Sequence, residues 1–221
     1  MTRKKMTYNA ARDHMMPGDV VAFGGRGSFA ELIKFGTRSD VSHVAVVLKT
    51  EILGNTSGRY FNLLVESTGS NGVATVRFSD VMRDYKGEIW WLPLNEESRD
   101  ERFFETAFFD FLFLQVRQRK DYDLPQALRA ALDSLDALHG PGHNRQDFAR
   151  FFCSELIAAA FQAGGLVDGI NASEVTPIEL CNWNIYAPAY VHLKGSMRKR
   201  IRDFNSLEPG ARIRVRREPQ R

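Results

Sequence analysis

One of the two cysteines in this 221-residue chain stands where a thiol could act as a nucleophile. Cys153 precedes SELIAAAFQAGG, a segment whose apolar residues fit one face of a helix. Cys153 is thereby predicted at or near a helix N-terminus, where backbone N–H groups and the helix dipole favour a thiolate and can bind an oxyanion. The alternative is a structural thiol, because free cysteine is among the most buried residue types.

A histidine and a glutamate upstream could activate such a thiol. His43 lies in the apolar run VSHVAVVL, and an imidazole on a buried strand needs partners for its ring nitrogens. Glu66 ends LLVE and could accept from one ring nitrogen, leaving the other to face Cys153. Taken singly, His43 could equally be a core histidine whose ring nitrogens are hydrogen-bonded within the fold. Glu66 taken alone could be a surface carboxylate at the end of a strand. Together the three residues have the types of a nucleophile, its base and an orienting acid.

Elements that could position these residues follow from the hydrophobic pattern. Five β-branched or apolar runs in the first half predict strands, at 18–23, 42–48, 61–68, 73–78 and 88–94. The short connection between the third and fourth predicts an antiparallel hairpin. Helical patterns are found at 28–36, 97–119, 123–138, 147–165 and 176–183. Thr176, Pro177 and Glu179 predict a capping box for the last of these. The sequence therefore predicts an α+β fold, a small antiparallel sheet packed on helices.

Composition limits the class of protein. Hydrophobic residues are 43% and charged residues 26% of the chain, which excludes disordered, collagen-like and low-complexity architectures. Two cysteines exclude a disulfide scaffold and suit a reducing compartment. The basic N-terminus lacks a following apolar segment, so a cytoplasmic location is expected, although export by another route would leave the same sequence. The Phe-rich segment 103–116 is too short for a membrane span of about 20 residues and predicts a buried core helix.

Charge is concentrated at the C-terminal end. Residues 194–221 contain 10 basic and 3 acidic residues, against 20 and 24 in residues 1–193. Alternation in RKRIRDF and ARIRVRR predicts a solvated hairpin in this region. A basic tail can also contact anionic membranes weakly. Nucleic acid is not an expected partner, and the oligomeric state is left open.

Several blocks of the sequence resemble the circularly permuted papain-like proteins of the NlpC-related superfamily, specifically the YiiX/YebB-like group. The matching blocks cover about residues 16–186 and are PGDVVAFGG (17–25), SHVAVVL (42–48), VESTGSNGV (65–73), KDYDL (120–124), FFCSELIAAAFQAGGL (151–166) and TPIEL (176–180). The resemblance implies a permuted papain-like fold, with a small antiparallel sheet or barrel packed against helices. It also implies a hydrolase domain over 1–193 and a basic extension or hairpin over 194–221.

The resemblance assigns roles residue by residue. It implies Cys153 as nucleophile, His43 as base and Glu66 as the orienting residue. Tyr122 matches an aromatic position near the site, and Ser42 and Ser154 are expected to contact substrate or support the site. The implied activity is a thiol hydrolase of the cysteine peptidase or amidase kind, which cleaves a peptide or cell-wall-peptide-like amide bond through an acyl-enzyme. No cofactor or metal is expected, and the expected partner is a small peptide or acyl substrate.

Two alternatives remain open. Distant permuted relatives act on lipid acyl groups, so the same triad could serve a lipid acyl hydrolase or acyltransferase. The fold could also serve as a binding module without turnover. Elsewhere, His139, His143 and Asp147 suggest a metal site only weakly, because Gly-Pro-Gly breaks the helix that would align the two rings. Cys181 has no paired histidine nearby and is predicted to be structural.

Overall fold

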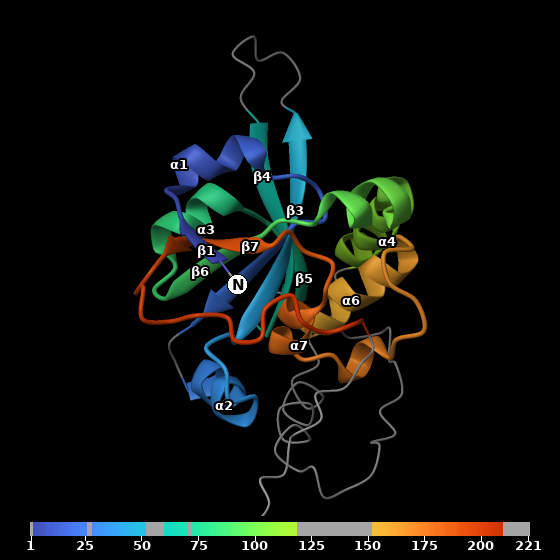
Figure 1. Cartoon of the computed structure of the whole chain (residues 1–221). Helices are drawn as coiled ribbons and strands as arrows, with labels where there is room; N and C mark the ends of the chain where they lie inside the picture. The colour runs from blue at the N-terminus through green and yellow to red at the C-terminus, as the bar shows by residue number, and fades with distance from the viewer. Residues whose placement is uncertain (1, 26–27, 52–59, 70–71, 119–151, 210–221) are drawn as a thin grey trace, which may run out of the picture.

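The computed structural model describes residues 2–25, 28–51, 60–69, 72–118 and 152–209, which form an α+β fold. A single seven-stranded sheet runs through the molecule, and helices pack on both of its faces (Figure 1). Two buried clusters of apolar side chains, one on each face, make up the core. The α+β prediction is therefore confirmed.

The sheet has the strand order β1-β7-β6-β2-β3-β4-β5. Neighbouring strands are antiparallel except for the parallel pair β1–β7. The sheet is mixed and open, so the expectation of an antiparallel sheet or barrel is corrected on both counts. The strands are β1 (Thr2–Lys5), β2 (Val20–Gly24), β3 (His43–Glu51), β4 (Tyr60–Thr68), β5 (Gly72–Arg77), β6 (Glu88–Leu92) and β7 (Ala189–Lys194).

All five predicted strands are present, as β2 to β6. Their β-branched and aromatic side chains suit a sheet that is covered on both faces, and every residue of β2 and β6 is buried. The predicted hairpin is confirmed by the antiparallel β4–β5 pair, which closes with Thr68 opposite Gly72. Strands β1 and β7 were not predicted. β1 reads TRKK, and this polar edge strand carries no hydrophobic alternation to reveal it.

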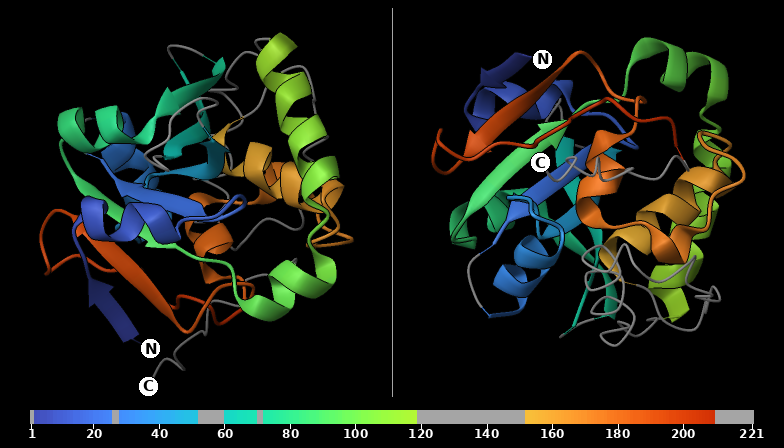
Figure 2. Two further views of the ribbon diagram at one scale, coloured as in Figure 1. Left: turned by 90° about the horizontal axis from the view of Figure 1, so that it is seen from above. Right: turned by 60° about the horizontal axis from the view of Figure 1, so that its bottom comes forward.

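Three helices cover one face of the sheet, with α6 (Cys153–Ala163) packed directly on β3 and β4. Helix α4 (Glu105–Gln118) packs on α6, and α7 (Pro177–Asn182) lies beside it (Figure 2). The predicted capping box of α7 is confirmed, because Thr176 Oγ1 accepts from Glu179 N while Glu179 Oε2 accepts from Thr176 N at 2.9 Å. Two short helical turns, η2 (Ser98–Arg102) and η3 (Ala172–Glu174), complete this side.

The opposite face is covered by α1 (Tyr8–Ala11), the turn η1 (Arg12–His14) and α3 (Phe78–Asp84). Helix α2 (Ser28–Gly36) joins β2 to β3 and lies at one end of the sheet (Figure 1). The helix predicted at 28–36 is thus confirmed, whereas α3 was not predicted. Its sequence, FSDVMRD, is short, and only Phe78 is buried, so no helical period marks it.

The Phe-rich segment differs from its prediction. The helix begins at Glu105 rather than near residue 97, and it buries only one side, through Phe108, Leu112 and Gln115. Phe104 and Phe113 are 68% and 59% exposed, so the prediction of a buried core helix was wrong. No helix within the described part of the chain is long and apolar enough to cross a bilayer.

The chain beyond β7 packs on the body of the molecule. Ile201 and Phe204 are buried in the larger core cluster, where Phe204 stacks on Tyr186 and meets Tyr190 edge-on. Residues 198–204 form turns rather than the predicted first strand of a hairpin, because these two apolar side chains turn inward to the core. The helix predicted at 123–138 and residues 210–221 lie outside the described residues.

Candidate active site

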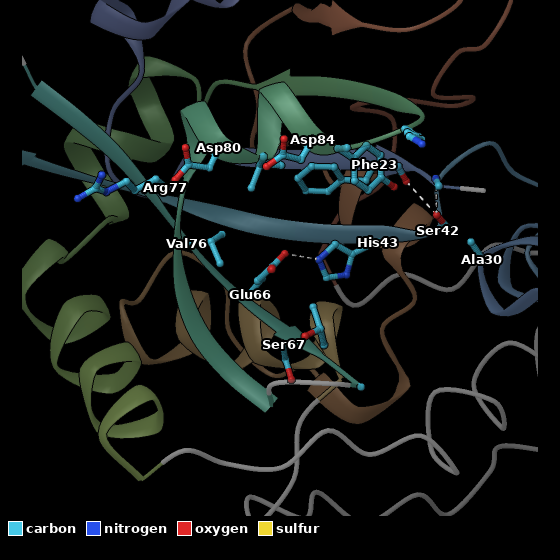
Figure 3. A pocket seen from close by; sticks show the side chains of 16 residues that line it. Phe23, Ala30, Ser42, His43, Glu66, Ser67, Val76, Arg77, Asp80 and Asp84 are labelled. Carbon is cyan, nitrogen blue, oxygen red and sulfur yellow. Dashed lines mark hydrogen bonds and ion pairs between the residues drawn. The ribbon is translucent and has the colours of Figure 1, made fainter. Parts of the chain in front are cut away.

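The candidate site lies where two strands of the sheet separate. Strand β3 pairs with β2 from its first residue, His43 opposite Phe23, but it pairs with β4 only from Val46 opposite Val65 onward. Strand β4 continues past this point, paired with β5 alone. His43 and Glu66 therefore flank an opening between β3 and β4, and both side chains have room beside the backbone (Figure 3).

The imidazole and the carboxylate meet across this opening. His43 Nε2 lies 2.9 Å from Glu66 Oε2, and the two side chains are 20% and 16% exposed. With Nε2 engaged by Glu66, the remaining ring nitrogen is Nδ1. The ring also interacts with the side chain of Cys153, which raises its pKa, and with the ring of Phe23. The structure thus brings together the three residues that the sequence analysis singled out, with His43 in the middle.

Electrostatics in this cluster favour a charged imidazole. Burial by itself lowers the pKa of His43, but the negative charge and hydrogen bond of Cys153, followed by those of Glu66, outweigh burial and raise the pKa to about 10. Burial raises the pKa of Glu66, yet its hydrogen bond to His43 and the charge there hold that pKa below its ordinary value. An imidazolium between two anions is the charge state that this arrangement stabilises.

Cys153 is the first residue of α6, on the face of the sheet that α4, α6 and α7 cover. The preceding residue, Phe152, is in extended conformation and has no polar side-chain atom to cap the helix. The backbone N–H groups of Cys153 and Ser154 come before the first intrahelical bond, which runs from Leu156 N to Phe152 O at 3.0 Å. Uncapped N–H groups beside a sulfur atom can hold a negatively charged oxygen.

A pocket of about 1110 Å³ opens next to His43 and Glu66 (Figure 3). Its walls come from the start of β3, the ends of β4 and β5, helix α3 and the start of α2. Charged side chains of α3, including Asp80 and Asp84, stand along one rim. Cys153 is only 2% exposed and is not among the residues that line this pocket.

The other expected site residues have different positions. Ser42 lines the pocket, where its Oγ accepts from Gly25 N at 2.9 Å and donates to Phe23 O at 3.2 Å. Ser154 is fully buried, and its Oγ donates to Val175 O at 2.6 Å. It therefore ties α6 to the segment after η3 and does not face the pocket, because the helix turns it inward. Tyr122 lies outside the described residues.

The second cysteine provides an internal contrast. Cys181, in α7, has no exposed surface, and burial raises the pKa of its thiol. No histidine hydrogen bond to Cys181 is found among the described residues. This environment agrees with a structural role for Cys181.

Two residues beside the site were not identified from sequence. The Phe23 ring lies 5.4 Å from the His43 imidazole, and the Tyr85 ring lies 5.0 Å from Phe23 on the other side. Pairing the strands predicted at 18–23 and 42–48 would have placed Phe23 opposite His43. Tyr85 had no comparable signal, because it follows α3, which the sequence pattern did not reveal.

Across the described ranges, no group of three or more histidine, cysteine, aspartate or glutamate side chains is arranged to hold a metal ion. The weak metal candidate formed by His139, His143 and Asp147 lies outside the described residues.

Comparisons with known proteins give a limited result. No protein-family model matches the chain, and no curated protein matches it either. Among solved structures, the fold is similar to the crystal structure of metalloprotein yiiX from Escherichia coli O157:H7, which carries the designation DUF1105. The two share 16% identity at a TM-score of 0.45, over 67% of this chain and 66% of that chain. The chain thus spans just under two thirds of YiiX, and the likeness concerns the fold alone.

Proposed function

We propose that this protein is a thiol hydrolase with a permuted papain-like fold, which cleaves an amide bond through Cys153, His43 and Glu66. The observation that carries the proposal is the position of His43. Its Nε2 is hydrogen-bonded to Glu66 at 2.9 Å, and its pKa is raised by the side chain of a cysteine at the start of a helix. A nucleophile, a base and a group that orients the base are the parts that covalent catalysis requires.

The reaction begins with transfer of the Cys153 proton to His43 Nδ1, which yields a thiolate and an imidazolium. The sulfur attacks the amide carbonyl carbon, and the electron pair of the C=O double bond moves to oxygen. Backbone N–H groups of Cys153 and Ser154 stabilise that oxyanion. When the C–N bond breaks, the amine leaves with the proton from His43, and a thioester remains on Cys153.

Hydrolysis of the thioester completes the cycle. His43 takes a proton from water, the hydroxide adds to the carbonyl carbon, and the thiolate leaves as the imidazolium forms again. Glu66 serves both halves of the reaction by accepting from Nε2–H. This hydrogen bond keeps Nδ1 directed at the sulfur and stabilises the positive charge on the ring. The lowered pKa of Glu66 keeps its carboxylate ionised at neutral pH.

Selective alkylation tests the proposal directly. Chloroacetamide is reacted with the intact protein near pH 7, and each cysteine is quantified by peptide mass spectrometry. We expect Cys153 to react at least about 100-fold faster than Cys181, since the thiolate is the reactive form and Cys181 is buried as a neutral thiol. Cys181→Ala is the matched control and should leave the fast reaction intact. Equal, slow labelling of both cysteines would contradict the hydrolase and favour a binding module.

Turnover then identifies the bond. A set of fluorogenic amides and thioesters is assayed with wild type and Cys153→Ala, and the acyl-enzyme is sought by intact mass after rapid acid quench. We expect a covalent adduct on Cys153 in the wild type only. Reactive labelling without turnover of any amide would redirect the search to other acyl substrates.

A lipid acyl substrate is the second candidate, and the surface of α4 favours it. Phe113 and Leu114 are 59% and 49% exposed, and neighbouring Phe104 is exposed as well. Exposed apolar side chains of this kind can enter a membrane interface. Sedimentation with phosphatidylcholine–phosphatidylserine vesicles should then show binding that Phe113→Ser abolishes. A truncation that tests the basic tail must keep residues up to 209, because Ile201 and Phe204 are in the core.

A further inference from the structure

We propose that Tyr85 is a positioning residue for His43, acting through Ser42 on the backbone side of the imidazole and through Phe23 on its ring. This inference deepens the proposed function and rests on it. Tyr85 follows α3 and lines the same pocket as His43. The contacts through which Tyr85 can position the imidazole are those with Ser42 and Phe23, which lie next to His43 in the chain and in space.

The first connection runs from the Tyr85 hydroxyl to the Ser42 side chain. Both groups border the space beside Gly25, where an added Cβ atom would lie 2.8 Å from the Tyr85 hydroxyl oxygen and 3.3 Å from Ser42 Oγ. Ser42 Oγ is itself fixed, because it donates to Phe23 O at 3.2 Å and accepts from Gly25 N at 2.9 Å. Burial raises the pKa of Tyr85, so the phenol keeps its proton throughout the neutral range. Ser42 directly precedes His43, and fixing it fixes the backbone that carries the imidazole.

The second connection is a series of ring contacts, from Tyr85 to Phe23 and from Phe23 to His43. Tyr85 and Phe23 have ring centroids 5.0 Å apart at an angle of 60°, and Phe23 and His43 have centroids 5.4 Å apart at 37°. Phe23 is 1% exposed, so it cannot turn away without opening the core. The need for such support is clear from the sheet, because β3 has no β4 partner at His43. Tyr85 packs on Phe23, and Phe23 packs on the imidazole.

Two glycines leave space for Tyr85. A Cβ atom on Gly25 would lie 2.8 Å from the Tyr85 hydroxyl oxygen, and one on Gly87 would lie 2.9 Å from Tyr85 Cε1. The Gly87 Cβ would also lie 2.4 Å from Gly24 O. Side chains at these positions would displace the ring or the backbone around it. The close fit on both sides restricts the phenol to one place, as a positioning role requires.

The test compares Tyr85→Phe with Tyr8→Phe. Tyr8 is a matched control because its ring also packs on a phenylalanine, Phe78, at a centroid distance of 4.8 Å on the same face of the sheet, and it does not line the pocket. Chloroacetamide labelling of Cys153 is followed from pH 5 to 10, and the His43 ring is titrated by NMR. We expect Tyr85→Phe to slow labelling about tenfold at pH 7 and to move the His43 titration to lower pH. Tyr8→Phe should change neither.

A double substitution identifies the route. If the hydroxyl acts through Ser42, then Tyr85→Phe should have little further effect in a Ser42→Ala background. Phe23→Leu tests the ring contacts separately and should shift the His43 titration in the same direction. It also keeps the inference testable if Tyr85→Phe folds poorly.

The outcomes separate this inference from the proposed hydrolase. Unchanged labelling and an unchanged His43 titration in both Tyr85→Phe and Phe23→Leu would overturn the role of Tyr85 and leave the hydrolase standing. Slow labelling of Cys153 in the wild type, together with a His43 titration that still moves in Tyr85→Phe, would reject the hydrolase and support the positioning.

Discussion

Two histidine–glutamate pairs occur among the described residues, and only one has the surroundings of a candidate catalytic site. His43 and Glu66 meet at 2.9 Å where β3 and β4 separate. His192 of β7 and Glu88 of β6 meet at 3.1 Å on paired strands near the other edge of the sheet. The residue types and the distances are nearly the same, so the difference must come from what surrounds each ring.

The ring of His192 has no nitrogen left for chemistry. Its Nε2 also lies 2.7 Å from Lys194 O, and its Nδ1 lies 3.0 Å from Met197 Sδ. The side chain of His192 is 2% exposed, whereas that of His43 is 20% exposed and lines a pocket. A histidine–carboxylate pair is therefore a structural link when both nitrogens are committed to the fold. It becomes a candidate site when one nitrogen faces a thiol.

The largest expected effect distinguishes the two histidines by activity. His43→Ala removes the base, and we expect labelling and turnover at Cys153 to fall about 10³-fold. His192→Ala should keep most of the rate per folded molecule, because its ring contacts no part of the site. Rates are measured with chloroacetamide and the best fluorogenic substrate, normalised to the folded fraction from circular dichroism. A comparable loss in both variants would show that the contrast between the pairs is mistaken.

Stability should rank the same two variants in the opposite order. His192→Ala leaves Glu88 Oε2 and Lys194 O buried without their partner, which should lower the free energy of unfolding by about 3 kcal/mol. His43→Ala should cost less than about 1.5 kcal/mol, since its site is open to a pocket and water can reach Glu66. Urea unfolding followed by tryptophan fluorescence measures both values. A more destabilised His43→Ala would mean that His43 is the structural member of the two.

The two carboxylates give a smaller but sharper contrast. Glu66→Gln keeps an oxygen for His43 and removes the charge that supports the imidazolium, so we expect the labelling rate to fall about tenfold. Glu88→Gln should leave that rate unchanged. The Glu88 carboxylate accepts hydrogen bonds from Ser196 N and from the His192 ring, and it takes no part in the site. Both rates come from the chloroacetamide assay. An equal effect of the two substitutions would point to a general loss of structure.

The sequence predicted the local helices and strands and the candidate site residues. It did not predict the long-range contacts that bring these elements together. The β-branched runs predicted β2 to β6, and helical spacing with a following Gly-Gly placed Cys153 near the start of α6. Three features depend on long-range packing that no local pattern encodes. These are the separation of β3 from β4 beside His43, the inward turn of Ser154, and the approach of Tyr85 to Ser42.

The sequence patterns also failed to predict which side chains of two segments are exposed to solvent. The phenylalanines of segment 103–116 predicted a buried core helix with only a thin polar stripe, yet α4 packs at the margin of the molecule and keeps Phe113 exposed. Likewise, the arginine-rich segment 198–204 was expected to alternate as a strand, whereas Ile201 and Phe204 anchor it as turns. In both cases tertiary packing, rather than the periodicity, decided which side chains meet water.

The smallest expected effect concerns the pH dependence of stability. The pKa of His43 is about 10 in the folded protein against an ordinary value near 6.5. A histidine with a raised pKa contributes stability that is complete below pH 6.5 and disappears as the pH rises through about 10. After the opposing effect of burial, Cys153 makes the largest contribution that raises this pKa, so Cys153→Ala should reduce the decline by about 1 kcal/mol. Cys181→Ala should preserve it.

Urea unfolding at intervals from pH 3 to 10 measures both sides of the profile in wild type, in both cysteine variants and in Glu66→Gln. Glu66 provides the acid counterpart, because its lowered pKa contributes stability that is present above its ordinary value and lost as the pH falls. Glu66→Gln should therefore flatten the acid side of the profile, and Cys153→Ala the alkaline side. Parallel profiles for wild type and Cys153→Ala would mean that the Cys153 sulfur does not interact electrostatically with the His43 ring. The contrast between the two histidine–glutamate pairs would then lose its physical basis.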